Sequence, residues 1–277
     1  MSLYLKTKDY FNTQEEFDLL YNNEFDMLST HPIPKNLDTY YNSEDYVSHS
    51  DQKKNIIDKI YQLVKKYSLK KKVGLLNKYT KDSYKLLDIG AGTGEFLLTA
   101  KSKGWETTGI EPNELARNNA ALKGINLKSD ISKIENNTYD AITLWHVLEH
   151  LPNLEEQTKK ITSLLKKNGT LIIAVPNYKS YDAKKYGPYW AAYDVPRHLH
   201  HFSKNSISKI FQKHSMEIID IKPMLFDSYY VSLLSEKYKN NSNRYFNAFI
   251  TGLTSNLKAM SSGEYSSLIY VLKKVKN

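Results

Sequence analysis

Short apolar runs alternate with amphipathic segments over most of the chain. The apolar runs predict strands at residues 85–89, 105–110, 125–128, 139–144, 170–175, 218–221 and 267–272. Amphipathic segments predict helices that begin at about residue 93 and span residues 113–123, 153–166 and 206–214. Alternation of this kind predicts an α/β fold, in which helices cover both faces of a parallel sheet.

The segments outside this alternating region are predicted to be helical. Thr13 and Glu16 have the spacing of a capping box, and Phe17, Leu20 and Tyr21 follow at helical spacing. Residues 51–67 predict an amphipathic helix, with a short helical segment at 73–76. We therefore expect an N-terminal helical and loop arm at residues 1–80, which packs on the main domain or covers its substrate, and a main domain at 81–277. Within that domain, residues 226–262 predict a helical insertion before the last strand.

Composition narrows the classes of function. The chain has 277 residues, no cysteine and a formal net charge of +9, which excludes disulfides and thiolate zinc sites. Its positive charge comes almost entirely from dispersed lysines, whereas nucleic-acid sites favour arginine, so a nucleic-acid partner is disfavoured. We find no signal peptide and no apolar run long enough to span a bilayer, and we expect a cytoplasmic protein.

The most informative motif follows the first predicted strand. Gly90, Gly92 and Gly94 have the spacing G-x-G-x-G, and Asp88 precedes them. Dinucleotide sites use G-x-G-x-x-G instead, and a carboxylate at this place repels a pyrophosphate but suits a cation. The motif resembles motif I of the class I S-adenosylmethionine-dependent methyltransferases, whose cofactor carries an ammonium and a sulfonium.

Two later segments strengthen this resemblance. Residues 145–152 are similar to the segment after the fourth strand in the ubiquinone-biosynthesis O-methyltransferases. Residues 189–202 resemble the W-x-x-x-D-x-P-R-H-x-x-H-F pattern of a family of small-molecule methyltransferases. The resemblance implies a Rossmann-like, doubly wound, seven-stranded sheet with an antiparallel last strand, and the cofactor S-adenosyl-L-methionine. It also implies O- or C-methylation of a small-molecule or lipid-like acceptor by a monomer or homodimer, with weak contact to a membrane surface left open.

The resemblance assigns cofactor contacts residue by residue. Glu111 ends the second predicted strand, where an acidic residue bonds ribose hydroxyls in nucleotide-binding sheets. Asp130 has two interpretations, as a contact to the adenine amino group or as a helix cap. The predicted cofactor-binding residues are Asp88, Gly90, Ala91, Gly92, Gly94, Glu111, Pro112, Asp130, Trp145 and His146.

The acceptor wall is predicted after the fifth strand. Its predicted substrate-binding residues are Tyr189, Trp190, Tyr193, Arg197 and His198. We expect His146 and His198 to supply acid–base catalysis, since a hydroxyl acceptor needs a proton acceptor. The structural alternative is that Trp190 belongs to the core and that Asp194 and Arg197 hold the loop by an ion pair.

Three further hypotheses remain at this point. Some relatives bind a divalent metal through E-x-x-E-H, but His146 replaces the first Glu, with Glu149 and His150 following, and we predict no metal. An NAD-dependent oxidoreductase would also use the glycine turn and Glu111. A non-catalytic protein associated with nucleic acid or membrane would account for the net charge of +9.

Overall fold

A computed structural model of the chain describes residues 1–41, 56–80, 84–136 and 138–275. The chain divides into two units. The first unit comprises Met1–Asn42, His146–Thr158 and Ile173–Val271, and the second comprises Ser43–Trp145, Lys159–Ile172 and Leu272–Asn277.

The second unit contains the predicted strand–turn–helix motif. Strand β4 (Lys85–Ile89) pairs in parallel with β5 (Glu106–Ile110) and with β6 (Tyr139–Trp145). Helix α3 (Glu95–Lys101) follows β4, and α4 (Glu114–Ala121) follows β5. Leu86, Leu87 and Ile142 are fully buried because these strands are covered on both faces. The predicted alternation is therefore confirmed in this part of the chain.

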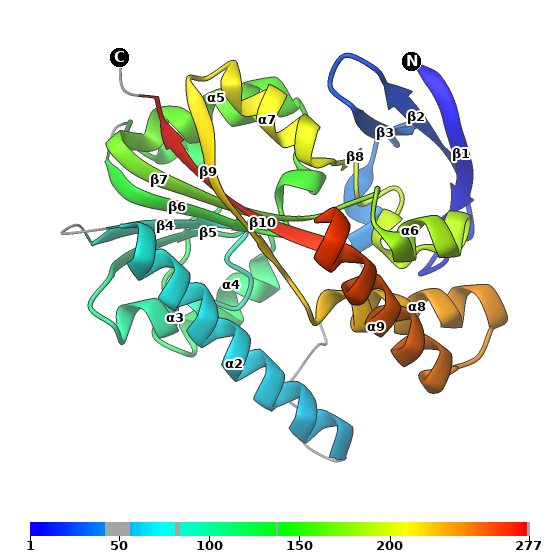
Figure 1. Cartoon of the computed structure of the whole chain (residues 1–277). Coiled ribbons are helices and arrows are strands. Elements are labelled where there is room, and N and C mark those ends of the chain that lie inside the picture. The colour runs from blue at the N-terminus through cyan, green and yellow to red at the C-terminus, as the bar shows by residue number, and fades with distance from the viewer. Residues whose placement is uncertain (42–55, 81–83, 137, 276–277) are drawn as a thin grey trace. The chain divides into compact units, whose positions relative to one another are not determined.

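Helix α2 (Ile56–Tyr79) is longer than the sequence predicts and merges the two expected helical segments. Residues 51–55 of the predicted helix lie outside the described residues. Lys65 Nζ lies 2.6 Å from Glu95 Oε2, which joins α2 to α3, and the two helices lie side by side in Figure 1. Trp105 Nε1 donates to Asn77 Oδ1 at 2.9 Å and fixes the C-terminal part of α2.

The predicted third strand at residues 125–128 is reduced to a single bridge between Ile110 and Lys128. Within the described residues, the bridge is made by two backbone hydrogen bonds, from Lys128 N–H to Gly109 C=O and from Glu111 N–H to Lys128 C=O, both 2.9 Å. The side chain of Ile125 is instead used to pack beneath Gly94. The apolar run is thus explained by packing, and a full strand is not formed.

The N-terminal segment of the first unit is a sheet, and the helix predicted after Thr13 is wrong. Strands β1 (Ser2–Lys8), β2 (Glu16–Asn22) and β3 (Met27–His31) pair antiparallel, and β3 pairs with β8 (His200–His201). Phe17 and Leu19 are buried at alternate positions of β2, which is the period of a strand. The short 3-10 helix η1 (Leu37–Tyr41) is the helical element that the structure describes in residues 1–41. The division of domains at residue 80 stays a prediction.

The remaining elements are η2 (Ile131–Lys133), η3 (Leu148–His150), α5 (Leu154–Leu164), β7 (Leu165–Pro176), α6 (Tyr181–Tyr186), η4 (Gly187–Tyr189), η5 (Ala191–Tyr193), α7 (Lys204–Gln212), β9 (Met216–Pro223), α8 (Asp227–Asn240), α9 (Tyr245–Ser262) and β10 (Ser267–Lys274). Among them, α5, β7, α7, β9, α8, α9 and β10 correspond to predicted helices and strands, whereas α6 and the 3-10 helices η2 to η5 were not predicted. The predicted helical insertion is confirmed as α8 and α9, which lie side by side in Figure 1. Gly252 permits their close approach, because a Cβ there would lie 3.0 Å from the backbone of Tyr229.

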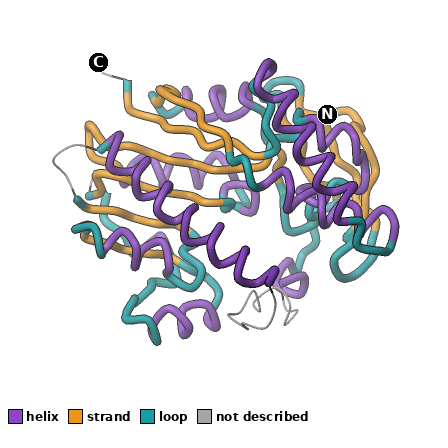
Figure 2. Tube along the Cα trace, turned by 60° about the horizontal axis from the view of Figure 1, so that its bottom comes forward, coloured by secondary structure: helices purple, strands orange, loops and turns teal. Residues whose placement is uncertain are grey.

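The central sheet has six strands in the described residues, in the order β5-β4-β6-β7-β10-β9 (Figure 1). Figure 2 shows strands in orange and helices in purple. The fold is therefore α/β as predicted, while a seventh strand and an antiparallel β10 stay predictions. Among the described residues, no helix combines the length and apolarity needed to cross a membrane.

Candidate active site

The turn between β4 and α3 has open space beside Gly92, whereas Gly94 packs closely against neighbouring side chains. Gly92 has φ +53°, and a Cβ added there would meet no atom within 4 Å. Gly94 has φ +76°, and its Cβ would lie only 3.1–3.3 Å from Ile125 and Ala120. Positive φ favours glycine at both positions. The open approach to the backbone is therefore at Gly92.

Glu111 holds this turn from the end of β5. Its Oε2 accepts the Gly92 N–H at 2.8 Å, and its Oε1 accepts the Asn113 N–H at 2.9 Å. A carboxylate has about four acceptor sites, so each oxygen retains capacity for a further donor. Glu111 is half-buried, and this arrangement places an acceptor beside the open glycine.

Asp88 lies at the same end of β4 but is buried, with 2% exposure. The Thr143 hydroxyl donates to its Oδ1 at 2.6 Å. Burial raises the pKa of Asp88 to about 7, although the Thr143 hydrogen bond and the positive charge of Lys72 oppose this shift. A ligand cation nearby would favour the ionised form, so Asp88 is suited to sense one.

The other predicted cofactor residues of the second unit have identifiable local roles. Asp130 caps η2, since its carboxylate accepts the Ser132 N–H at 2.8 Å and the Ser132 hydroxyl at 2.6 Å. The cap interpretation of Asp130 is thus confirmed, while an adenine contact stays a prediction. Trp145 is half-buried against Phe96 and beneath the ammonium of Lys72, which lies 4.3 Å from its ring. Ala91 is buried and Pro112 is exposed.

His146 belongs to the first unit and is held by two carboxylates. Its Nδ1 lies 3.3 Å from Glu149 Oε1, and its Nε2 lies 3.1 Å from Asp227 Oδ2. Burial lowers the pKa of His146, but the hydrogen bonds and charges of Asp227 and Glu149 outweigh it and raise the pKa to about 10. A protonated imidazole cannot accept a proton, so His146 is suited to act as an acid or a cation. Asp227 is absent from the predicted site; its only sequence signal is its place at the start of the insertion.

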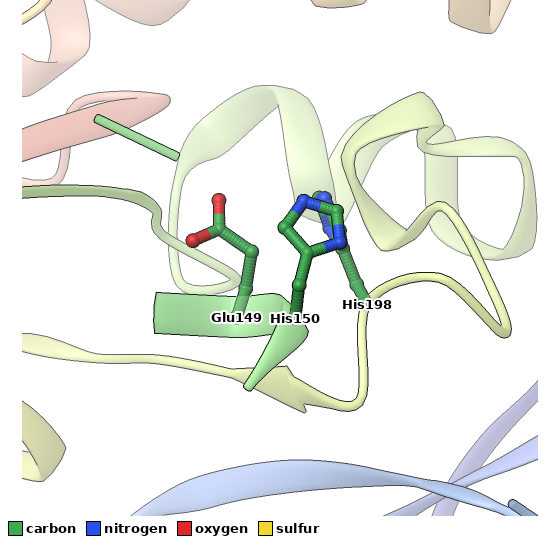
Figure 3. A group of neighbouring side chains, drawn as sticks. All are labelled: Glu149, His150 and His198. Carbon is green, nitrogen blue, oxygen red and sulfur yellow. The ribbon is translucent and has the colours of Figure 1, made fainter. Parts of the chain in front are cut away.

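Glu149, His150 and His198 form a cluster in the first unit, in which Glu149 and His198 are buried and His150 is half-buried (Figure 3). Glu149 and His150 come from η3, and His198 comes from the loop that follows η5. The rings of His150 and His198 are 4.5 Å apart and nearly perpendicular. Burial and the neighbouring His198 lower the pKa of His150 to about 4, so this ring is neutral at pH 7. The predicted base His198 thus lies beside Glu149 and His150, the two residues that match part of the E-x-x-E-H pattern.

Most predicted substrate-binding residues have partners within the protein. Arg197 is buried, and its guanidinium donates to Asp9 Oδ1 and Asp194 Oδ1, each at 2.7 Å. Trp190 is buried, and its Nε1 donates to Asp182 Oδ2 at 2.8 Å. Tyr193 is also buried in this core, whereas Tyr189 is half-buried beside Tyr10. These contacts hold the loop in place, and direct acceptor contacts stay a prediction.

The chain matches a known protein family. Residues 54–221, more than half of the chain, match the family described as "Methyltransferase domain". The chain belongs to the class I S-adenosylmethionine-dependent methyltransferases. Its cofactor is therefore S-adenosyl-L-methionine, as the G-x-G-x-G spacing predicts, and the NAD-dependent alternative is wrong.

Similar proteins carry O-methyltransferase names. The chain is 27% identical over 157 residues to "Ubiquinone biosynthesis O-methyltransferase" of Rickettsia typhi. The match covers 51% of this chain and 63% of the Rickettsia typhi protein. It is 26% identical over 200 residues to the protein of the same name from Rickettsia prowazekii, covering 65% of this chain and 78% of that one. The chain thus spans less than two thirds of the first of these relatives.

Solved structures share the fold. A SAM-dependent methyltransferase of Thermotoga maritima, described as a possible histamine N-methyltransferase, superposes with a TM-score of 0.53 at 16% identity. The match covers 79% of this chain and 96% of that chain. At this identity, the likeness supports the fold alone.

Proposed function

We propose that this methyltransferase transfers the methyl group of S-adenosylmethionine to a hydroxyl oxygen of a small-molecule acceptor. The observation that carries the proposal is the arrangement of Glu111 and Asp88 around the open backbone at Gly92. These two carboxylates match the two polar ends of the cofactor, which are a ribose diol and an ammonium group.

Each cofactor residue has a proposed role. Glu111 accepts the ribose hydroxyls with the lone pairs that Gly92 and Asn113 leave unused. Asp88 faces the ammonium end, and binding of that cation lowers the pKa of Asp88 and keeps it ionised. Trp145 supplies an apolar wall. Asp130 contacts the adenine amino group with the oxygen lone pairs that remain after capping η2.

The reaction needs alignment and one proton transfer. The sulfonium is already a good leaving group, so the protein mainly holds the acceptor oxygen in line with the methyl carbon. The oxygen attacks the methyl carbon, the carbon–sulfur bond breaks, and the hydroxyl proton must leave. His198 accepts that proton; its Nε2 lies 4.0 Å from Asp194 Oδ2, too far for a hydrogen bond. His146, held protonated between Glu149 and Asp227, stabilises negative charge on the acceptor oxygen.

The acceptor is proposed to be lipid-like. The names of the Rickettsia relatives give oxygen as the methylated atom and ubiquinone, a polyprenylated quinone, as the end product. Helix α9 exposes Phe246, Phe249, Leu257 and Met260 by between 54% and 76%, and it contains no Asp or Glu. Such a face suits weak contact with a membrane surface or an apolar chain. A monomer or homodimer stays a prediction.

Methyl-labelled S-adenosylmethionine tests the reaction. The acceptors are phenols with and without a short polyprenyl chain, and primary amines of matched size serve as the control. We expect label on the phenols, more on the prenylated ones, and none on the amines. Label found only on amines, or no transfer to any acceptor by protein that binds the cofactor, would contradict the proposal.

The role of the His198 cluster needs a matched variant. His198→Ala should lower turnover by roughly 10²–10⁴-fold, with the affinity for S-adenosylmethionine retained. His200→Ala, two residues away, controls for loss of a neighbouring imidazole. Thermal unfolding of both variants shows whether a lower rate reflects fewer folded molecules. Full activity per folded His198→Ala molecule would remove the cluster from the reaction.

A further inference from the structure

Three potential ligand atoms converge in the cluster of Glu149, His150 and His198. One ligand atom from each side chain lies within 4.8 Å of the other two. Figure 3 shows the Glu149 carboxylate and the His150 ring rising from the same short helix, with His198 beside them. Two ligand atoms on one ion are at most about 4.2 Å apart, twice a bond of about 2.1 Å. Small side-chain rotations therefore suffice to close the set around an ion.

The two imidazoles are already held in the orientation that metal ligands adopt. His150 Nδ1 lies 3.0 Å from Arg197 C=O, and His198 Nδ1 lies 2.9 Å from Ala192 C=O. The Tyr41 hydroxyl, 3.1 Å from His150 Nδ1, donates to the same Arg197 carbonyl at 3.3 Å, so it does not need the lone pair of Nδ1. A carbonyl only accepts, so each Nδ1 carries the proton and each Nε2 keeps its lone pair. Among the described residues, neither Nε2 has a hydrogen-bond partner. Metal-bound histidines in proteins are commonly fixed by this contact of the other ring nitrogen.

Glu149 contributes a buried oxygen that lacks a partner. Its side chain is 1% exposed, and its Oε1 faces His146, while Oε2 makes no hydrogen bond within the described residues. A buried, unpaired carboxylate oxygen is costly, so it calls for a counterpart. A cation bound by Oε2 and two imidazole Nε2 atoms provides one.

The backbone ties the two segments that carry the ligands. Leu199 N–H donates to Glu149 C=O at 2.8 Å, and the Thr30 hydroxyl donates to His198 C=O at 2.6 Å. Arg197, which accepts from His150 through its carbonyl, is itself fixed by the buried Asp9. A site held in this way is preorganised, because little backbone has to be ordered on binding.

We propose that Glu149, His150 and His198 bind one divalent transition-metal ion. The ligand set departs from the E-x-x-E-H pattern of some relatives, in which the first position supplies a Glu. Here that position is His146, and both of its ring nitrogens are engaged by carboxylates. His198, far away in the sequence, takes the third place. Two nitrogens and one oxygen suit Zn²⁺, Fe²⁺, Co²⁺ or Mn²⁺ better than Mg²⁺, which prefers oxygen alone.

Binding of the ion does not depend on methyl transfer. A role of the ion in activating the acceptor hydroxyl does depend on it. Three protein ligands leave coordination positions open, and a bound cation lowers the pKa of a hydroxyl that reaches it. His198 then serves as a ligand, and not as the base assigned to it above. This last step rests on the proposed function.

Cobalt titration tests the site directly. Protein without an affinity tag is stripped with a chelator and titrated with Co²⁺, while the visible absorption of the bound ion is recorded. We expect one Co²⁺ per chain, displacement by Zn²⁺ and no displacement by Mg²⁺. Absence of Co²⁺ and Zn²⁺ binding by calorimetry, or displacement by Mg²⁺ at equal concentration, would overturn the proposal.

Matched variants test the ligand set. His198→Ala and Glu149→Gln should each weaken Co²⁺ binding by more than about 100-fold, beyond the 10–100-fold typical of outer contacts. If the ligand set followed the E-x-x-E-H pattern, residue 146 would be a ligand and His146→Gln would weaken binding equally. We expect His146→Gln to weaken Co²⁺ binding much less. Near-wild-type binding in His198→Ala, with binding lost in His146→Gln, would refute this set. Thermal unfolding of each metal-free variant identifies any that fails to fold, and His198→Gln then replaces His198→Ala.

The same samples separate this proposal from the proposed function. Metal-free protein that binds no Co²⁺ yet transfers labelled methyl would refute the metal site and leave methyl transfer intact. Protein that binds Co²⁺ stoichiometrically but never transfers methyl would refute the proposed methyl transfer and leave the metal site intact.

Discussion

Replacement of Arg197 by Met distinguishes a loop-holding residue from an acceptor contact. The Arg197 side chain is 1% exposed and that of Asp9 is 0% exposed, and they meet at 2.7 Å. Asp9 also accepts the N–H groups of Phe11, Asn12 and Thr13, so it cannot move away when its partner is removed. Removing one member of a buried ion pair typically costs about 3–5 kcal/mol, because the other charge stays buried. We expect a loss of this size in the free energy of unfolding.

Urea unfolding followed by tryptophan fluorescence measures this loss. The matched control is the double variant Asp9→Asn with Arg197→Met, which removes both charges and should recover a large part of the stability. Arg197→Lys should be intermediate, because an ammonium lacks the planar fork that reaches Asp9 and Asp194 together. An Arg197→Met protein with the wild-type urea midpoint and no methyl transfer would refute the reasoning and make Arg197 an acceptor contact.

Three further predictions concern carboxylates. Glu111→Ala should weaken S-adenosylmethionine binding by about 1–3 kcal/mol, the scale of charge-assisted hydrogen bonds, and leave turnover at saturating cofactor nearly unchanged; normal affinity with lost turnover would contradict this. The affinity for S-adenosylmethionine should rise with pH through about 7, where Asp88 ionises, and calorimetry should find this rise reduced in Asp88→Asn. Burial opposes ionisation of Asp26, but hydrogen bonds from Lys179, Ser203 and Tyr178 lower its pKa to about 2. Ionised Asp26 therefore contributes about 2 kcal/mol to the free energy of unfolding, a value that follows from the size of the pKa shift. This contribution is present above pH 4 and is lost as the pH falls towards 2. The urea midpoint of the wild-type protein should therefore fall more steeply between pH 4 and pH 2 than that of Asp26→Asn.

The strand, the glycine turn and the acidic residue of the cofactor site could be predicted because their sequence signals are local. The apolar run before Gly90, the glycine spacing and Glu111 all lie within a few dozen residues, and each acts through its own strand or turn. The two insertion helices were also predicted, because their apolar residues recur at helical spacing. Such features depend little on distant contacts.

Other features depend on partners far away in the sequence. Phe17, Leu20 and Tyr21 fit a helix, but Phe17 and Leu19 fit a strand equally well, and pairing with β1 and β3 decides the outcome. Asp9, moreover, takes the Thr13 hydroxyl that the sequence assigns to a helix cap. The engagement of His146 by Asp227 joins residues 81 positions apart. No local pattern contains that information.

The central claim is that the turn at Gly92 binds S-adenosylmethionine, and calorimetry tests it most directly. Wild-type protein is titrated with S-adenosylmethionine and, separately, with NAD⁺. Gly92→Ala and Gly124→Ala are then compared, because both positions have positive φ and neither Cβ would meet an atom within 4 Å. We predict one S-adenosylmethionine per chain, no NAD⁺ binding, at least about tenfold weaker binding in Gly92→Ala, or 1.4 kcal/mol, and near-normal binding in Gly124→Ala. Tight NAD⁺ binding, or S-adenosylmethionine binding that Gly92→Ala leaves unchanged, would contradict the account.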